Sequence, residues 1–195
     1  MLHVIDDFLP LEQLAALSRL CESHGGLKNQ LDGDRLFSWY STDSTEANTT
    51  RSVHSAANQA LMRSYLSHHL LAVIASFAPN HIGIEWWCNT NNDLDWHIDK
   101  DETVYRATGR HDLPLLSTVF YPHISCAGGE LLLAHHEAIS DGSRETMPTF
   151  QSVISIPPVM NRLVLFSPGL LHRINPFQGE RYSIAANVWS HPLQN

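Results

Sequence analysis

Cysteine is scarce in this chain of 195 residues, in which only Cys21, Cys88 and Cys126 occur and no two form a C-x-x-C pair. Three widely spaced cysteines argue against a disulfide framework and against a cysteine-based zinc site. Such usage is typical of a protein in a reducing compartment, so we expect a cytoplasmic location.

Long hydrophobic runs and an excess of positive charge are also missing. No apolar stretch approaches the ~18 residues that span a bilayer, and residues 1–7 lack the basic start and apolar stretch of a secretory signal. The formal net charge is −8, from 12 Lys and Arg against 20 Asp and Glu. Because phosphate backbones are bound largely through Lys and Arg, we expect neither a nucleic-acid nor a membrane partner. The sequence leaves the oligomeric state open.

Neither an internal repeat nor a Pro/Gly/Ser-rich linker divides the chain, so we expect one domain over residues 1–195. Apolar spacing predicts a mostly helical support over residues 1–80. It contains a short helix from Pro10 to Gly25 and a long helix from Val53 to about Pro79. The polar stretch between them, residues 32–50, predicts a loop with at most one strand.

After residue 80 the apolar pattern changes to alternation and to short β-branched or aromatic runs. These runs predict strands at residues 82–88, 115–121, 130–133, 150–156, 162–166 and 182–189. Turn signals separate them, as in an antiparallel barrel or sandwich. The sequence therefore predicts a mainly β core over residues 81–195, flanked by helices.

Two histidines and one aspartate carry the strongest chemical signal. His97 and Asp99 form an H-x-D pair, and in a strand residues two apart point toward the same side. His172 follows the Pro168-Gly169 turn, and closure of a barrel brings it across as a third ligand. Two imidazoles and a carboxylate bind a non-heme Fe(II) and leave positions open for O₂ and an organic acid. The alternative is a polar strand end at the surface, because a lone H-x-D pair is common by chance.

An R-x-S pair, Arg181 and Ser183, follows nine residues after His172. Strand alternation places the two on one face, where a guanidinium fork and a hydroxyl can hold a carboxylate bidentately. Taken alone, a surface arginine in an i,i+2 strand pair is the more frequent explanation. Beside an iron site, however, a dicarboxylate that chelates the metal through its keto acid end needs a fixed cation for its far carboxylate.

Most other aromatic and histidine side chains are expected to have structural roles. The tryptophans on or beside predicted strands are expected in the core rather than in a pocket, namely Trp86, Trp87, Trp96 and Trp189. Several histidines lack an H-x-D partner and are not expected to be ligands, namely His111, His123, His135 and His136.

Four ordered motifs resemble the 2-oxoglutarate and Fe(II)-dependent oxygenases, specifically their prolyl 4-hydroxylase-like branch. They are W-H-I-D at Trp96–Asp99, G-G-E-L at Gly128–Leu131, N-R-L-V-L-F-S-P-G-L-L-H-R-I at Asn161–Ile174 and R-Y-S-I at Arg181–Ile184. The opening I-D-D-F-L-P at Ile5–Pro10 is similar to the start of that branch. These motifs are specific to the superfamily, though not to a substrate.

The resemblance implies a double-stranded β-helix, also called a jelly roll or cupin-like fold. It implies that His97, Asp99 and His172 hold Fe(II), that Arg181 holds the far carboxylate of the co-substrate 2-oxoglutarate, and that ascorbate is a candidate stimulant. The carboxylate of Asp99 favours hydroxylation or desaturation over halogenation, because related halogenases have a small residue in its place.

The resemblance also implies a hydroxyl group beside that far carboxylate. Ser183 is the first candidate, and Tyr105 and Thr118 are the next two.

We therefore expect a 2-oxoglutarate-dependent dioxygenase that uses O₂ to hydroxylate an amino acid, a peptide residue or a small metabolite, with release of succinate and CO₂. One alternative is a prolyl hydroxylase that acts on a protein. The arginine at position 181, where prolyl hydroxylases often have lysine, disfavours it. A second alternative is a non-catalytic cupin-like metal-binding or sensing protein, and the R-x-S pair argues against it.

Overall fold

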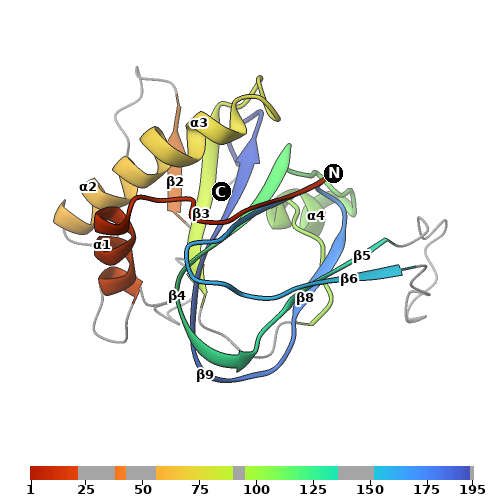
Figure 1. Cartoon of the computed structure of the whole chain (residues 1–195). Coiled ribbons are helices and arrows are strands. Elements are labelled where there is room, and N and C mark those ends of the chain that lie inside the picture. Colours follow the sequence, from red (N-terminus) through yellow and green to blue (C-terminus); the bar gives the residue numbers. More distant parts are fainter. Residues whose placement is uncertain (22–37, 43–55, 90–94, 136–151, 194–195) are drawn as a thin grey trace.

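The structure is a computed structural model of the chain, and it describes residues 1–21, 38–42, 56–89, 95–135 and 152–193. In these residues the strands form two antiparallel sheets that enclose a common interior (Figure 1). The larger sheet has the order β1-β7-β4-β9-β3-β2, and the smaller has the order β6-β5-β8. The predicted jelly roll with flanking helices is confirmed.

Six of the strands overlap the predicted runs, although β4 ends seven residues later and β9 begins five residues earlier than predicted. Those of the large sheet are β1 (Leu2–Ile5), β2 (Ser38–Ser41), β3 (Gly83–Asn89), β4 (Leu116–Gly128), β7 (Leu163–Phe166) and β9 (Phe177–Trp189). Those of the small sheet are β5 (Leu131–His135), β6 (Ser152–Ile156) and β8 (Leu171–Ile174). The long strands β4 and β9 pair from Leu116 opposite Val188 to Gly128 opposite Phe177, with a register shift between Phe120 and His123.

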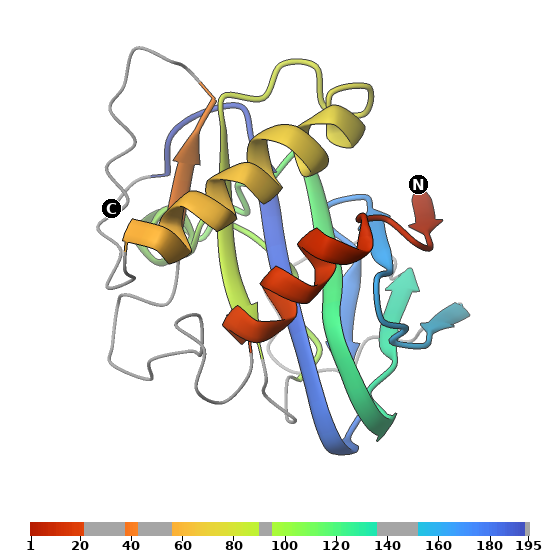
Figure 2. The ribbon, with the colours of Figure 1, turned by 60° about the vertical axis from the view of Figure 1, so that its left-hand side comes forward.

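Helices cover the outer face of the large sheet (Figure 2). They are α1 (Leu11–Cys21) and the continuous segment made of α2 (Ala56–Ser64), η2 (Tyr65–Leu70) and α3 (Leu71–Ile74). Within this segment η2 is a π-helix, in which the N–H of Leu71 donates to the carbonyl of Leu66. The structure describes no helix long and apolar enough to cross a membrane.

Three elements depart from the sequence prediction. The strand β1 comes from the first 80 residues and pairs with β7, and β8 pairs with β5 although no strand is predicted at residues 171–174. By contrast, β2 is the one strand that the sequence allows within residues 32–50, and it pairs with β3. A short unpredicted helix, α4 (Glu102–Thr108), begins where the Asp101 carboxylate accepts from the Val104 N–H at 2.9 Å. It ends at Gly109, whose φ is +72°.

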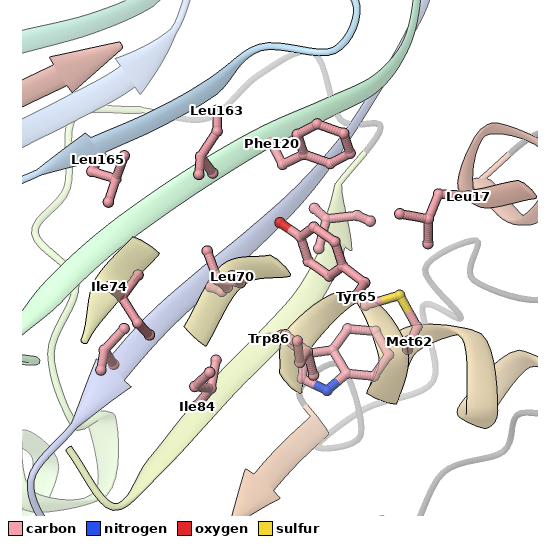
Figure 3. Packing of buried hydrophobic residues seen from close by; sticks show 14 of the residues in the cluster. Leu17, Met62, Tyr65, Leu70, Ile74, Ile84, Trp86, Phe120, Leu163 and Leu165 are labelled. Atoms are coloured by element: carbon pink, nitrogen blue, oxygen red, sulfur yellow. The ribbon is translucent and has the colours of Figure 1, made fainter. Parts of the chain in front are cut away.

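The large sheet buries side chains on both of its faces. On the outer face, residues of β3, β4, β7 and β9 pack against the helices, with Leu70 and Ile74 fully covered at the centre (Figure 3). On the inner face, Val119, Val164 and Phe166 pack against the small sheet. Strand alternation thus decides which residues reach the interior between the sheets.

Candidate active site

Three side chains far apart in sequence meet between the two sheets. Ligand atoms of His97, Asp99 and His172 all lie within 4.8 Å of one another. The Oδ1 atom of Asp99 lies 3.6 Å from Nε2 of His172 and 3.9 Å from Nε2 of His97. Protein ligands lie roughly 2 Å from a bound transition metal, so ligands of one ion lie roughly 3–4 Å apart. The spacing therefore fits a single metal ion.

The backbone brings His97 to His172 through one isolated β-bridge. In this bridge the two residues exchange N–H to carbonyl hydrogen bonds of 3.0 and 2.9 Å. Asp99 lies outside any strand, just before the cap of α4. The prediction that both residues of the H-x-D pair lie on a regular strand is therefore wrong, although their side chains do converge.

Hydrogen bonds fix both imidazoles with Nε2 toward the metal position. Nδ1 of His97 lies 2.8 Å from the carbonyl of Asp95, and Nδ1 of His172 lies 3.0 Å from the carbonyl of Leu170. Because a carbonyl oxygen only accepts, each Nδ1 carries the proton and each Nε2 keeps its lone pair. Burial also lowers the pKa of His172 below its ordinary 6.5, which favours the neutral, ligating form.

Asp99 is oriented by Ser117, a residue that sequence reasoning missed. The Ser117 hydroxyl donates to Oδ2 of Asp99 at 2.9 Å, and this leaves Oδ1 facing the two imidazoles. Ser117 is buried on β4. Such a partner of a ligating carboxylate holds it in its binding orientation.

Arg181 lies on β9 and is only 1% exposed. Its Nε donates to the carbonyl of Gly129 at 3.1 Å, and its Nη1 donates to the Ser183 hydroxyl at 3.4 Å. Among the described residues, its Nη2 has no hydrogen-bond partner and Arg181 forms no salt bridge. Because a buried unpaired charge is costly, this guanidinium requires an anion.

A second unpaired polar group lies beside this guanidinium. Tyr121 is fully buried, its ring centroid lies 5.0 Å from Cζ of Arg181, and its hydroxyl has no hydrogen-bond partner among the described residues. Burial raises the pKa of Tyr121, so its hydroxyl stays protonated and can donate. Two buried donors without acceptors fit one carboxylate, such as the far carboxylate of 2-oxoglutarate.

The G-G-E-L motif gives Arg181 its space. Gly128 and Gly129 both have positive φ, +86° and +81°, as expected for a turn before a strand. A Cβ at Gly129 would lie 2.9 Å from Cδ of Arg181. A glycine at this position therefore lets the guanidinium lie against the backbone carbonyl.

The candidates for the assisting hydroxyl separate in space. Ser183 is buried beside Arg181 and donates to the carbonyl of Asn89 at 3.3 Å. Thr118 faces the helices on the outer side of β4 and donates to the carbonyl of Ala186 at 3.1 Å. Tyr105 lies on α4 and is 39% exposed, with Nζ of Lys100 over its ring. The structure thus brings Ser183 to Arg181, and it does not bring Thr118 or Tyr105 there.

Residues 84–190, more than half of the chain, match the family model of the 2OG-Fe(II) oxygenase superfamily. The chain belongs to this superfamily. It is a 2-oxoglutarate- and Fe(II)-dependent oxygenase, because the matched region contains an intact His97, Asp99 and His172 triad.

Solved structures of superfamily members share the fold of this oxygenase. A prolyl-4-hydroxylase from Pseudomonas putida is 18% identical with a TM-score of 0.59, over 98% of this chain and 93% of that one. A 2OG-Fe(II) oxygenase family oxidoreductase from Burkholderia pseudomallei is 11% identical with a TM-score of 0.62, over 100% and 87%. A Trichoplax adhaerens prolyl hydroxylase in complex with a hypoxia inducible factor peptide is 19% identical with a TM-score of 0.53, over 97% and 83%. No curated protein matches the chain.

Proposed function

We propose that this oxygenase hydroxylates an amino acid, a peptide residue or a small metabolite, with consumption of O₂ and release of succinate and CO₂. The observation that carries the proposal is the unpaired pair of donors, Nη2 of Arg181 and the Tyr121 hydroxyl, in the same interior as the His-Asp-His triad. A metal site used only for sensing or structure has no need of a second, buried anion site.

In this proposal His97 and His172 would hold ferrous iron through Nε2, and Asp99 would hold it through Oδ1. A set of two histidines and one carboxylate would leave the iron able to bind 2-oxoglutarate and O₂ as well. Iron with 2-oxoglutarate supplies the oxidative chemistry, in which the keto acid is decarboxylated and a C–H bond is hydroxylated. Ser117 keeps the Asp99 carboxylate turned toward the metal throughout.

Arg181 and Tyr121 hold the far carboxylate of 2-oxoglutarate in the proposed complex, with Ser183 beside the guanidinium. Their burial excludes water from this end of the interior, which strengthens the charge-assisted hydrogen bonds. These residues are fixed before the co-substrate binds, since Nε and Nη1 of Arg181 are already engaged. The co-substrate thus enters a preorganised site.

Co-substrate binding without turnover tests the proposal. With Mn(II) in place of Fe(II) and O₂ excluded, calorimetry should detect binding of 2-oxoglutarate and far weaker binding of 2-oxobutyrate, which lacks the far carboxylate. The Arg181→Met variant should lose this discrimination, while its Mn(II) binding persists. With Fe(II) and O₂, the wild-type protein should form succinate. Equal affinity of the wild-type protein for both keto acids would refute the proposed co-substrate site.

A second candidate is hydroxylation of a prolyl residue, which the fold likeness to prolyl 4-hydroxylases favours. Mass spectrometry separates the two candidates. A gain of one oxygen on the prolyl residue of peptides, with none on other peptide residues, free amino acids or small metabolites, would support the second candidate. The reverse pattern would exclude it.

A further inference from the structure

One acidic residue lies on the inner face of the large sheet and has no role in the site described so far. Glu85 of β3 is opposite Asn187 of β9, and Asn187 is opposite Ser117 of β4. The neighbours of these residues in sequence, such as Ile84 and Val188, pack against the helices on the other face. Glu85, Asn187 and Ser117 therefore form a row across three strands on the interior side.

This row connects Glu85 to the metal ligands. Ser117 donates to Asp99, and neighbouring strands lie about 4.8 Å apart, so the backbone of Glu85 lies roughly 10 Å from that of Ser117. In a substrate whose charged group binds Glu85, an atom only a few bonds away could therefore reach the metal position. This distance suits the side chain of an amino acid.

Glu85 is also reachable. Along β3 the inward side chains of Glu85 and Trp87 are partly exposed and that of Asn89 is buried, whereas Ser117, Asn187 and Arg181 on the neighbouring strands are buried. Solvent therefore reaches the interior face of the sheet at Glu85 and Trp87.

The charge of Glu85 is not compensated within the described residues. Burial, with the charges of Asp99 and Asp101, raises the pKa of Glu85 from 4.5 to about 7, against the lowering effect of the Asn187 and Trp189 side chains. No lysine or arginine of the described chain contributes. Asp101 is already engaged as the cap of α4.

The bound cofactors would not compensate this charge either. The two positive charges of ferrous iron and that of Arg181 balance Asp99 and the two carboxylates of 2-oxoglutarate. Whenever Glu85 is ionised, its carboxylate is therefore an excess negative charge, which a cation in the substrate would neutralise.

The side chain of Asn187, which interacts with Glu85, also points to a donor-rich ligand. Asn187 is 3% exposed, and its Oδ1 has no hydrogen-bond partner among the described residues. An unpaired buried acceptor costs free energy until a donor reaches it. An ammonium or guanidinium group carries several donors, and so could satisfy both this oxygen and the Glu85 carboxylate. The neighbouring Trp87 ring can add a cation–π contact.

We propose that Glu85 and Asn187 bind the ammonium or guanidinium group of the substrate, so that this oxygenase hydroxylates the side chain of a basic amino acid. The inference rests on the proposed function, because it names the substrate class of the same site.

Binding of simple probes tests the inference without turnover. The protein is loaded with Mn(II) and 2-oxoglutarate in the absence of O₂ and titrated with butylguanidinium and butylammonium, with neutral butyramide as the matched probe. At least one cation should bind about ten- to hundredfold more tightly than butyramide, the range of a charge-assisted hydrogen bond. Glu85→Gln should abolish this preference. Glu12→Gln removes the same charge from exposed α1 and should leave the preference unchanged.

A wild-type protein that binds 2-oxoglutarate but shows no preference for either cation would overturn the inference and leave the proposed function intact. Failure to bind 2-oxoglutarate at all would overturn both. If Glu85→Gln does not fold, Glu85→Asp keeps the charge on a shorter side chain, and an unaltered affinity for both cations in that variant would also overturn the inference.

Turnover with Fe(II) and O₂ distinguishes the source of the cation. Free arginine and lysine, and their N-acetyl N-methylamide forms, are assayed by mass spectrometry for a gain of one oxygen. Product from the free or the blocked form would support the inference and identify a metabolite or a peptide residue as the substrate. Product from neutral amino acids alone would refute it.

Discussion

Replacing Glu85 with glutamine should make the metal-free protein more stable, and more so at high pH. The carboxyl has a pKa of about 7 in the folded chain and 4.5 as its ordinary value. Between these values the unfolded chain releases its proton while the folded chain keeps it. Stability is therefore lost as the pH rises from about 4.5 to about 7, and the loss is constant above that range.

The size of the effect follows from the same two values. The difference of 7 − 4.5 = 2.5 units corresponds to about 3.4 kcal/mol at about 1.36 kcal/mol per unit. About 2.5 kcal/mol of this is lost between pH 5 and pH 8. This is an upper value, because the side chain is partly exposed and solvent screens its charge. Glutamine has the shape of the protonated acid and does not titrate, so the Glu85→Gln variant does not lose this stability as the pH rises.

Urea unfolding in the presence of a chelator measures this difference. The gain in unfolding free energy of Glu85→Gln over the wild-type protein should be larger at pH 8 than at pH 5, by about 1–2.5 kcal/mol. The Glu12→Gln control changes an exposed carboxyl and should give the same difference at both pH values within error. A gain of Glu85→Gln that is independent of pH would refute the reasoning.

Three further substitutions test the metal and co-substrate positions. His97→Ala should abolish Mn(II) binding measured by calorimetry, because two ligands remain, and retained tight binding would remove His97 from the ligand set. Ser117→Ala should weaken Mn(II) binding about ten- to hundredfold, and an unchanged affinity would mean that Asp99 does not depend on this hydroxyl. Tyr121→Phe should weaken 2-oxoglutarate binding about tenfold without affecting Mn(II), and an unaltered Kd for 2-oxoglutarate would exclude the phenol from the site.

The sequence predicts most of the fold because its signals are local. Apolar spacing locates α1 and the helical segment that ends before Pro79, and alternation locates the strands after residue 80. β1 was not predicted because it has only four residues and lies at the edge of the sheet. The short helix α4 depends on a cap at Asp101 and a glycine at 109, and its 7 residues are too few to give a clear helical spacing of apolar residues.

The position of the assisting hydroxyl cannot be predicted from such local signals. Thr118 is one of the two candidates ranked behind Ser183 from the sequence, yet the inward residues of β4 are Ser117, Val119 and Tyr121. Strand alternation predicts that Thr118 and Tyr121 face opposite sides of the sheet, but it does not predict which of them faces the interior. Residues 116–122 of β4 are all buried, so this strand has no exposed polar face that would show which side chains point toward the interior.

The row of Glu85, Asn187 and Ser117 cannot be predicted from the sequence either, because it depends on the register between strands that are distant in sequence. Glu85, Asn187 and Ser117 are adjacent only because β3 and β4 both pair with β9, and each pairing would expose a different neighbour if it shifted by one residue. The H-x-D pair could be recognised because its two members are close in the chain. The substrate-binding residues proposed here could not, because their chemistry arises from the order of strands in the sheet rather than from any spacing along the chain.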